Sequence, residues 1–371
     1  MRISGAVSSV AGAKLVVEEL ELAGPGPAEV LVRIEAAGVC HSDYHYLRGD
    51  LPTRRPVVPG HEGAGVVEAV GERVSVVRPG DHVCLMWRPR CGRCEFCLTG
   101  RPELCQSGAV NGATGGLLDG TTRLRRPGGE PVHHLLGVSC FAQYAVVAEQ
   151  AVVPIPPDVP PEIAAITGCA VITGVGAMLN VAGSCAGQGV TIFGMGGVGL
   201  AAVMGAVLCG AHPIIAVDVV PERLDAAARL GATHLVDART QDVATAVAAA
   251  RPGGVEWAVE AIGRPATLAQ AFDVLRPGGT LVAVGLAASG ETLQIPVNLL
   301  VQREKRIVGS LYGSANPLVD VPRLLALHRA GRLPIDALVG ARYPLTAINE
   351  AFADLVAGGV GRGIVLPGAP A

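Results

Sequence analysis

Charged and aromatic side chains are scarce in this sequence. Only 16% of the 371 residues are charged and 3% are aromatic, and 29 Lys and Arg nearly balance 32 Asp and Glu. Because no basic tract is present that could neutralise a phosphate backbone, we expect no nucleic-acid partner. Residues 1–15 also lack the long apolar stretch of a secretory signal, which favours a cytoplasmic location.

The segment 163–217 contains no Asp, Glu, Lys or Arg at all. A run of this length is long enough to cross a bilayer. Closely spaced glycines and Pro213 interrupt it, however, and turns of small residues separate its apolar pieces, as in buried parallel strands and the helices that cover them. We therefore expect neither a membrane span nor a membrane partner.

Gly and Pro are plentiful, with 50 and 27 residues, and the length of 371 residues predicts roughly two domains. Up to about Pro160, short Val-rich runs predict mostly antiparallel strands. Beyond Pro160, helices expected at 164–179, 200–210 and 221–231 alternate with strands expected at 189–194, 213–219, 234–238, 255–263 and 279–285. This alternation predicts a doubly wound parallel sheet. Two helices and a final strand are expected within 317–333 and 348–366.

Four cysteines stand close together at Cys91, Cys94, Cys97 and Cys105. In a chain without an export signal, this spacing fits tetrahedral zinc better than disulfides. An iron–sulfur cluster is the main alternative, because the first three spacings also suit one, and four unrelated buried thiols are the other. Zinc held by four thiolates has no open coordination position, so the predicted role of this site is structural.

A second group of candidate ligands is dispersed along the chain, at Cys40, His61, Glu62 and Cys169. Singly, each of these residues could be an ordinary buried Cys or a satisfied structural His. Together, two thiolates and an imidazole make a three-ligand zinc site whose fourth position is open to water or substrate. The sequence therefore predicts a second zinc with a catalytic role.

Three glycines follow an expected strand and open an expected helix. Gly194 can make the tight turn, Gly196 lets the backbone approach a pyrophosphate, and Gly199 permits close helix packing. Asp218 ends the next strand, where its carboxylate can bind ribose hydroxyls and would repel the 2′-phosphate of NADP. We therefore predict NAD as the cofactor, although Arg223 could attract such a phosphate. A Gly-rich turn without a nucleotide is the alternative.

With these motifs in place, the chain resembles the zinc-containing medium-chain alcohol dehydrogenases, especially the liver-type branch, over nearly its whole length. The resemblance implies that Cys40, His61 and Cys169 hold the catalytic zinc, with Glu62 as an occasional alternative ligand. The four clustered cysteines correspond to the structural zinc of that family.

The resemblance also implies roles for residues around the catalytic zinc. Asp43 matches the carboxylate that orients His61, Ser42 the hydroxyl that binds the substrate oxygen, and His45 the end of the proton relay. At His41 some members carry an Arg that faces the pyrophosphate. Further cofactor contacts are implied at Thr173, Val198, Arg223, Arg264 and Arg362, of which Arg362 pairs with the pyrophosphate.

The fold implied by the resemblance is α/β, with a Rossmann cofactor domain inserted into a mainly β, GroES-like catalytic domain. Residues 1–170 would form the catalytic domain with both zinc sites, residues 171–311 the NAD-binding domain, and residues 312–371 the return to the catalytic domain. A homodimer or homotetramer is expected.

The implied activity is hydride transfer between a primary alcohol or aldehyde and NAD. The pocket residues implied by the resemblance are all apolar, namely Leu51, Trp87, Phe141, Leu286 and Leu311. Trp87 stands where the liver-type branch has Phe. Apolar walls favour an apolar substrate over a sugar or polyol, although ordinary core packing is the alternative for each residue.

Three other functions stay open at this stage. One is a thiol-adduct formaldehyde dehydrogenase, for which Arg123, Arg125 and Arg126 could supply the charge that binds a thiol cofactor. Another is a nicotinoprotein alcohol dehydrogenase, in which NAD is held permanently. The last is a metal- or nucleotide-binding protein that has lost turnover, which the intact ligand set argues against.

Overall fold

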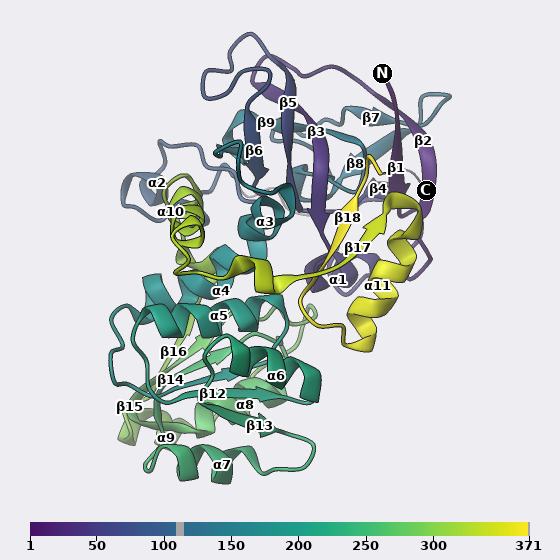
Figure 1. Ribbon diagram of the computed structural model, residues 1–371. Helices are drawn as coiled ribbons and strands as arrows, with labels where there is room; N and C mark the ends of the chain where they lie inside the picture. Colours follow the sequence, from purple (N-terminus) through teal and green to yellow (C-terminus); the bar gives the residue numbers. More distant parts are fainter. Residues whose placement is uncertain (109–114, 370–371) are drawn as a thin grey trace. The chain divides into compact units, whose positions relative to one another are not determined.

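The computed structural model describes residues 1–108 and 115–369, and the chain divides into two compact units (Figure 1). The first unit comprises Met1–Cys169, Asn316–Ala326 and Val339–Ala371, and the second comprises Ala170–Ala315 and Leu327–Leu338. The second unit is therefore an insertion in the sequence of the first. Residues 312–315 and Leu327–Leu338 differ from the predicted division, because they lie with the second unit rather than with the chain's return to the first.

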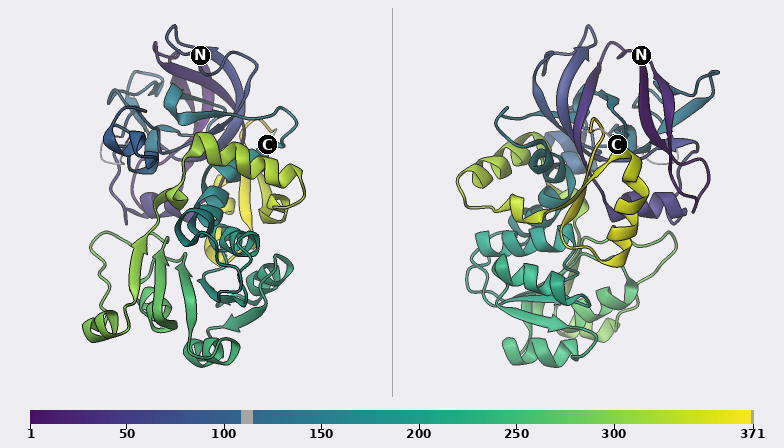
Figure 2. Two further views of the ribbon diagram at one scale, coloured as in Figure 1. Left: turned by 90° about the vertical axis from the view of Figure 1, so that its left-hand side faces the viewer. Right: turned by 45° about the vertical axis from the view of Figure 1, so that its right-hand side comes forward.

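Most strands of the first unit are antiparallel (Figure 2). They are β1 Arg2–Val7, β2 Val16–Leu22, β3 Glu29–Gly38, β4 Val57–Val58, β5 Glu62–Val70, β6 His82–Leu85, β7 Leu124–Arg125, β8 Pro131–His134, β9 Tyr144–Ala148, β10 Val152–Pro154, β17 Val339–Pro344 and β18 Arg362–Leu366. One sheet has the order β1–β2–β7–β8–β4, and the other has the order β10–β6–β5–β3–β18–β17, with β9 also paired to β3. The antiparallel strands expected before Pro160 are confirmed.

Alternation of buried side chains explains how β3 and β5 form the centre of the second of these sheets. Val30, Val32 and Ile34 of β3 are buried in the core of the first unit, and Val32 lies opposite Val67 of β5. Since successive side chains of a strand point to opposite faces, this spacing fixes the register of the pair. The rigid pair in turn positions the residues at the strand ends, including Glu62 at the start of β5.

Short helices complete the first unit. The α-helices are α1 His41–Arg48, α2 Glu95–Leu98, α3 Pro161–Ile166, α11 Ile348–Ala357 and α10 Pro317–Arg329, which belongs to this unit as far as Ala326. The 3-10 turns are η1 Pro102–Leu104, η2 Leu135–Gly137, η3 Glu149–Ala151 and η8 Leu345–Ala347. α10 and α11 agree with the two C-terminal helices expected from the sequence, and β18 agrees with the final strand.

Residues Pro161–Ala182 form a long apolar helical stretch with a mean hydropathy of 1.7. By length and composition it could cross a membrane, but 89% of its most apolar window is buried within the fold, as in the core helix of a globular protein. The stretch consists of α3, the π-helical turn η4 (Thr167–Val171), α4 (Ile172–Gly176) and the π-helical turn η5 (Ala177–Ala182). π-Helical turns frequently occur at functional sites, and η4 contains Cys169.

The second unit contains a parallel six-stranded sheet of order β13–β12–β11–β14–β15–β16. Its strands are β11 Val190–Phe193, β12 Ile214–Asp218, β13 His234–Asp237, β14 Val255–Glu260, β15 Leu275–Ala283 and β16 Arg306–Gly309. Its helices besides α4 are α5 Gly197–Leu208, α6 Pro221–Arg229, α7 Val243–Ala250, α8 Pro265–Asp273 and α9 Val297–Gln302, and its 3-10 turns are η6 Leu311–Ser314 and η7 Ile335–Leu338. Helices α7, α8 and α9 escaped sequence prediction, since helices of 8, 9 and 6 residues show little helical period.

The strand order of this sheet creates a place for a ligand. The chain runs outward from β11 to β13 and then returns to the other side of β11 with β14. Because such crossovers are right-handed, α5 and α6 cover one face of the sheet, and α7 and α8 cover the other (Figure 1). Ligands of doubly wound sheets bind outside the carboxyl ends of the strands at this point of reversal. The predicted fold class is confirmed.

Candidate active site and metal centres

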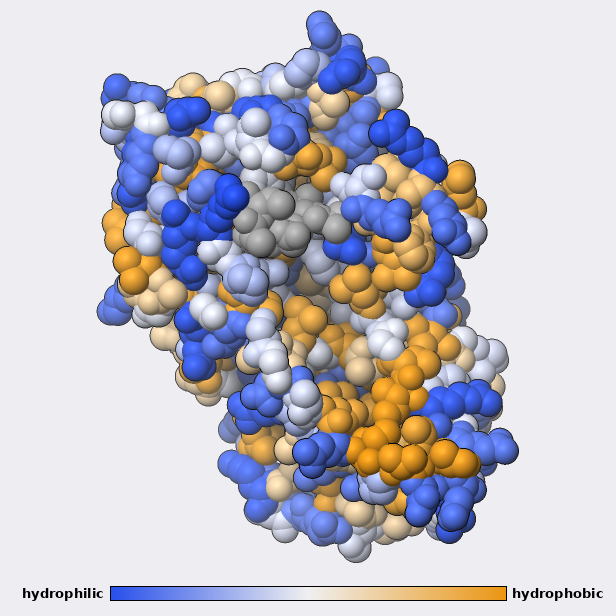
Figure 3. All heavy atoms as spheres, turned by 180° about the vertical axis from the view of Figure 1, so that it is seen from behind, coloured by the Kyte–Doolittle hydropathy of each residue, from blue (hydrophilic) through white to orange (hydrophobic). Residues whose placement is uncertain are grey.

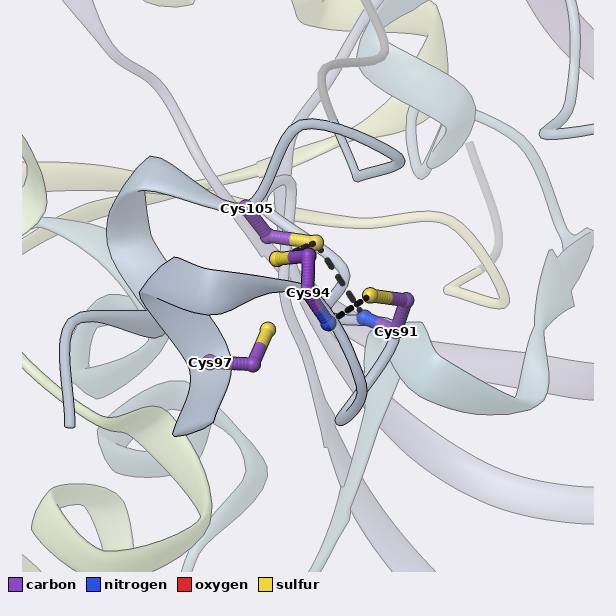
Figure 4. Close-up of side chains that lie close together, drawn as sticks. All are labelled: Cys91, Cys94, Cys97 and Cys105. Carbon is purple, nitrogen blue, oxygen red and sulfur yellow. Dashed lines mark hydrogen bonds between the residues drawn. The ribbon is translucent and has the colours of Figure 1, made fainter. Parts of the chain in front are cut away.

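The four clustered cysteines converge beside α2 (Figure 4). One ligand atom from each of Cys91, Cys94, Cys97 and Cys105 lies within 4.8 Å of the others. A tetrahedral zinc with sulfur ligands places the sulfur atoms about 3.8 Å apart. The Sγ atoms of Cys94 and Cys105 are 3.9 Å apart, so these thiols fit a metal enclosed by four sulfur atoms.

Backbone amides prepare this cluster to hold thiolates. The Cys94 N–H donates to the Sγ of Cys91 at 3.3 Å, and the Cys91 N–H donates to the Sγ of Cys105 at 3.2 Å (Figure 4). The backbone N–H of Arg93 helps to lower the pKa of Cys91 to about 6, whereas burial raises the pKa of Cys97 to about 12. A central cation favours the thiolate form of every ligand.

Cys40, His61, Glu62 and Cys169 also come together, although they are far apart in the sequence. Cys40 caps the N-terminus of α1, His61 and Glu62 lie at the start of β5, and Cys169 lies in η4. One ligand atom from each lies within 4.8 Å of the others, and all four residues are buried. The Sγ of Cys169 is 3.4 Å from the Nε2 of His61, close to the roughly 3.5 Å between sulfur and nitrogen ligands of one tetrahedral zinc.

Asp43 lies behind His61 on the side away from the cysteines. Its Oδ2 is 3.0 Å from the Nδ1 of His61, and its Oδ1 accepts the N–H of Gly60 at 3.0 Å. Burial acts to lower the pKa of His61, but Asp43 and Cys40 raise it well above its usual value. A carboxylate on Nδ1 leaves Nε2 available as a metal ligand.

The two catalytic-site thiols differ in acidity. A hydrogen bond from Cys169 lowers the pKa of Cys40 well below its usual value, and the same bond together with burial raises the pKa of Cys169. One thiolate and one thiol are therefore favoured when no cation is bound. A divalent cation between them favours two thiolates, so the donor set fits zinc.

Arg362 is buried beside the candidate zinc ligands. Its side chain in β18 is 4% exposed, its Nη2 is 3.1 Å from the Oε1 of Glu62, and its Nη1 donates to the carbonyl of Val39 at 3.4 Å. Burial raises the pKa of Glu62 to about 8, and Arg362 opposes this shift. The structure thus pairs the guanidinium with a buried carboxylate at the zinc site, and its contact with a pyrophosphate stays a prediction.

The relay candidates Ser42 and His45 lie on α1, one helical turn apart, and both are half-buried. Residues at this spacing share one face of a helix. The Nδ1 of His45 is 2.9 Å from the Oδ2 of Asp50, a residue that the sequence prediction missed. His41 is exposed at the first position of the same helix.

The Gly-rich turn between β11 and α5 has the geometry that a nucleotide requires. Gly194 has a φ of 88°, and a Cβ on Gly199 would lie 1.6 Å from the carbonyl oxygen of Gly194. A Cβ on Gly196 would have no neighbour within 4 Å, so open space lies beside this backbone. The first turn of α5 is uncharged, and a free helix N-terminus attracts a phosphate.

Asp218 lies at the carboxyl end of β12 and is 7% exposed. Its Oδ2 accepts the N–H of Met195 at 2.5 Å, and its Oδ1 accepts the N–H groups of Val219 and Val220 at 2.7 and 2.9 Å. These bonds hold the carboxylate against the Gly-rich turn. Oδ1 thus accepts two hydrogen bonds already, whereas Oδ2 retains a further lone pair that can accept a ribose hydroxyl.

The other implied cofactor contacts lie on the second unit. Thr173 and Val198 are half-buried in α4 and α5, Arg223 is half-buried near the start of α6, and Arg264 is exposed at the N-cap of α8. Their contacts with NAD stay predictions.

The implied pocket residues have different environments. In the first unit Leu51 is half-buried, and the Trp87 ring lies edge-on to the His61 ring at 6.2 Å. Phe141 is completely buried in the core and makes an edge contact with Phe352 at 5.9 Å, so the structure favours core packing over a pocket wall at this position. In the second unit Leu286 is exposed and Leu311 is half-buried.

Two family models match the chain. An alcohol dehydrogenase GroES-like domain matches residues 26–157, and a zinc-binding dehydrogenase domain matches residues 197–327. An NDMA-dependent alcohol dehydrogenase from Amycolatopsis methanolica is 40% identical over 370 residues, which cover 99% of this chain and 99% of the relative.

Solved structures agree with this similarity. An alcohol dehydrogenase zinc-binding domain protein from Burkholderia ambifaria has a TM-score of 0.94 at 40% identity. A benzyl alcohol dehydrogenase from Acinetobacter calcoaceticus has a TM-score of 0.93 at 36% identity, and each comparison covers 99% of both chains. The predicted family resemblance, with its zinc and NAD cofactors, is confirmed. The chain belongs to the zinc-containing alcohol dehydrogenase family and is an NAD-dependent zinc alcohol dehydrogenase.

Proposed function

We propose that this enzyme interconverts primary alcohols bearing an apolar group with their aldehydes. The observation that supports this most directly is the buried cluster of Cys40, His61 and Cys169, with the Trp87 ring edge-on to the ligand His61. An aromatic wall beside the reacting oxygen suits an apolar substituent and offers few polar partners to a polyol. The similarity to a benzyl alcohol dehydrogenase supports the same substrate class.

The residues of the first unit have distinct tasks in this reaction. Cys40, His61 and Cys169 would hold the zinc, which when bound would supply a Lewis acid that makes an alcohol hydroxyl more acidic, and NAD would supply the hydride acceptor. Asp43 holds His61 in the tautomer that binds the metal. Ser42 accepts a hydrogen bond from the substrate hydroxyl, and His45 passes the released proton to solvent.

A panel of alcohols and aldehydes tests the proposed substrate class. Reduction of NAD is followed at the NADH absorbance band, with benzyl alcohol, short aliphatic alcohols and sorbitol as substrates. We expect kcat/KM to be highest for the apolar primary alcohols. A preference for sorbitol would contradict the proposal. Formaldehyde, tested with and without a low-molecular-weight thiol, checks for the thiol-adduct activity.

A nicotinoprotein is the second candidate function. It is favoured by the similarity to an enzyme whose name states that its activity depends on NDMA. If NAD stays bound through turnover, the purified protein will release NAD on denaturation and will not reduce added NAD at a substantial rate. Release of no nucleotide would exclude this candidate.

Replacing His45 with glutamine should lower alcohol oxidation most at low pH. Without the imidazole, the proton must pass directly to water or hydroxide, and hydroxide is scarce in acid. We expect a loss of roughly tenfold near pH 6 and a much smaller loss near pH 9, with partial recovery in amine buffers. His82→Gln, at a half-buried position in β6, is the control. An unchanged pH profile of kcat/KM would place His45 outside the relay.

Replacing Asp218 with glycine should weaken the use of NAD and improve the use of NADP. The carboxylate that accepts ribose hydroxyls and repels a 2′-phosphate is lost, while Arg223 stays nearby. The ratio of the two specificity constants should move by up to roughly 3 kcal/mol. Asp237→Gly is the control, because Asp237 lies opposite Asp218 on the adjacent strand β13. If the unaltered enzyme prefers NADP, or if the ratio does not move, Asp218 is not the selector.

We further propose a homodimer or homotetramer. Exposed apolar side chains on α9 and the edge strand β16 support it, namely Val297, Leu299, Val301 and Ile307. Figure 3 shows hydrophobic atoms gathered on one side of this unit, and such patches mark protein interfaces. Analytical ultracentrifugation should give a multiple of the 37.7 kDa chain mass, and a monomer would contradict the proposal. A cytoplasmic location stays a prediction.

A further inference from the structure

Asp50 and His45 form a side-chain pair at the end of α1. The Oδ2 of Asp50 is 2.9 Å from the Nδ1 of His45. Because a carboxylate only accepts hydrogen bonds, Nδ1 carries the hydrogen, and Nε2 keeps a lone pair that can accept a proton. The side chains of His45 and Asp50 are 25% and 24% exposed, so the pair can exchange a proton with solvent.

Backbone geometry at the end of α1 builds this pair. Gly49 has a φ of 90°, its N–H donates to the carbonyl of Tyr46 at 3.2 Å, and the N–H of Asp50 donates to the carbonyl of His45 at 2.9 Å. This pattern is a Schellman motif, which brings the residue after the glycine beside the residue five positions earlier. The motif therefore places Asp50 beside His45. An apolar contact usually occurs between these two positions, but here they form an ionisable pair.

The other charged groups near the end of α1 do not compete with His45 for Asp50. The Nε of Arg48 is 3.8 Å from the Oδ2 of Asp50, but the Arg48 side chain is 57% exposed, so this ion pair is weak. Arg55 donates to the backbone carbonyls of Tyr46 and Leu47. Asp43, the acidic residue of α1 itself, contacts His61.

We infer that Asp50 is a positioning residue of the proton relay. The inference rests on the proposed function of His45. Asp50 holds the imidazole in the orientation and tautomer whose Nε2 accepts the relayed proton. The proton then leaves Nε2 to water, while the Nδ1 hydrogen stays on the bond to Asp50. No other group gains or loses charge in this step.

A double-mutant cycle on the holoenzyme tests the inference. D50A removes the carboxylate, D50N keeps its shape without the charge, and D50E restores the charge. D50A combined with H45Q shows whether the two residues act together. Asp81→Asn, in the ion pair with Arg78, is the control for loss of a carboxylate from the first unit. The pH profile of kcat/KM is measured for each variant, with thermal unfolding as a check of the fold.

We expect D50A and D50N to lose activity at low pH by about threefold to tenfold, D50E to recover part of it, and amine buffers to restore it. The double variant should be no slower than H45Q alone. If H45Q loses low-pH activity and both D50A and D50N match the unaltered enzyme, the inference is wrong and the relay stands. Fully additive losses would also overturn it. If H45Q itself shows no change, the proposed relay fails, and the inference fails with it.

Discussion

Replacing Cys169 with serine is expected to leave a folded enzyme whose turnover is more than about a hundredfold lower. Loss of a group that merely orients a zinc ligand costs about 10- to 100-fold, so loss of a ligand should cost more. Cys169 lies in a buried cluster with Cys40, His61 and Glu62. A serine there is nearly isosteric, so the surrounding packing changes little.

Metal analysis and thermal unfolding separate this result from general damage. The zinc content should fall from two to one per chain, and the melting temperature should change by only a few degrees. Cys84→Ser is the matched control, because Cys84 is fully buried in the same unit and its thiol donates to the carbonyl of Ala164 at 3.2 Å. If Cys169→Ser keeps both zinc ions and its turnover, Cys169 is not a ligand of the catalytic metal.

The sequence was most informative where chemistry depends on residue type and spacing. Cys91, Cys94 and Cys97 had to lie close together because only two residues separate each from the next. The Gly-rich turn predicted a strand followed by a helix. By contrast, Cys40 and Cys169 are far apart in the sequence, and only the fold brings them together. The sequence spacing did not predict that these residues lie together. That prediction came from the family resemblance.

Contacts that depend on tertiary packing were harder to predict. The ion pair of Arg362 with Glu62 was not predicted, and it arises because β18 pairs with β3 and buries the guanidinium there. Phe141 lies in the core, which the sequence left open as the alternative to a pocket wall. Nothing in the residue types of these positions distinguishes the alternatives, because an Arg pairs equally well with a phosphate or a carboxylate. Asp50 has a local signal in the sequence, because it follows the glycine that ends α1.

Replacing Cys97 with serine is expected to destabilise the protein rather than to impair the chemistry directly. Every residue of α2 is at least partly exposed, and Leu98 is 72% exposed. The segment from Cys91 to Cys105 therefore gains little stability from a hydrophobic core of its own. Metal binding supplies the folding energy of such segments, so the loss of one of four ligands should cost at least about 2 kcal/mol.

This destabilisation should appear as a fall in the melting temperature of roughly 5 °C or more, together with the loss of one zinc per chain. Activity measured well below the melting temperature should be retained in the fraction that stays folded, because the catalytic ligands Cys40, His61 and Cys169 are untouched. Cys209→Ser is the control, since Cys209 is also half-buried and lies outside both clusters. An unchanged melting temperature would show that the cluster does not stabilise the fold. A visible absorption band of an iron–sulfur cluster in the unaltered protein would show that four thiolates hold a different metal, because zinc thiolates are colourless and an iron–sulfur cluster is not.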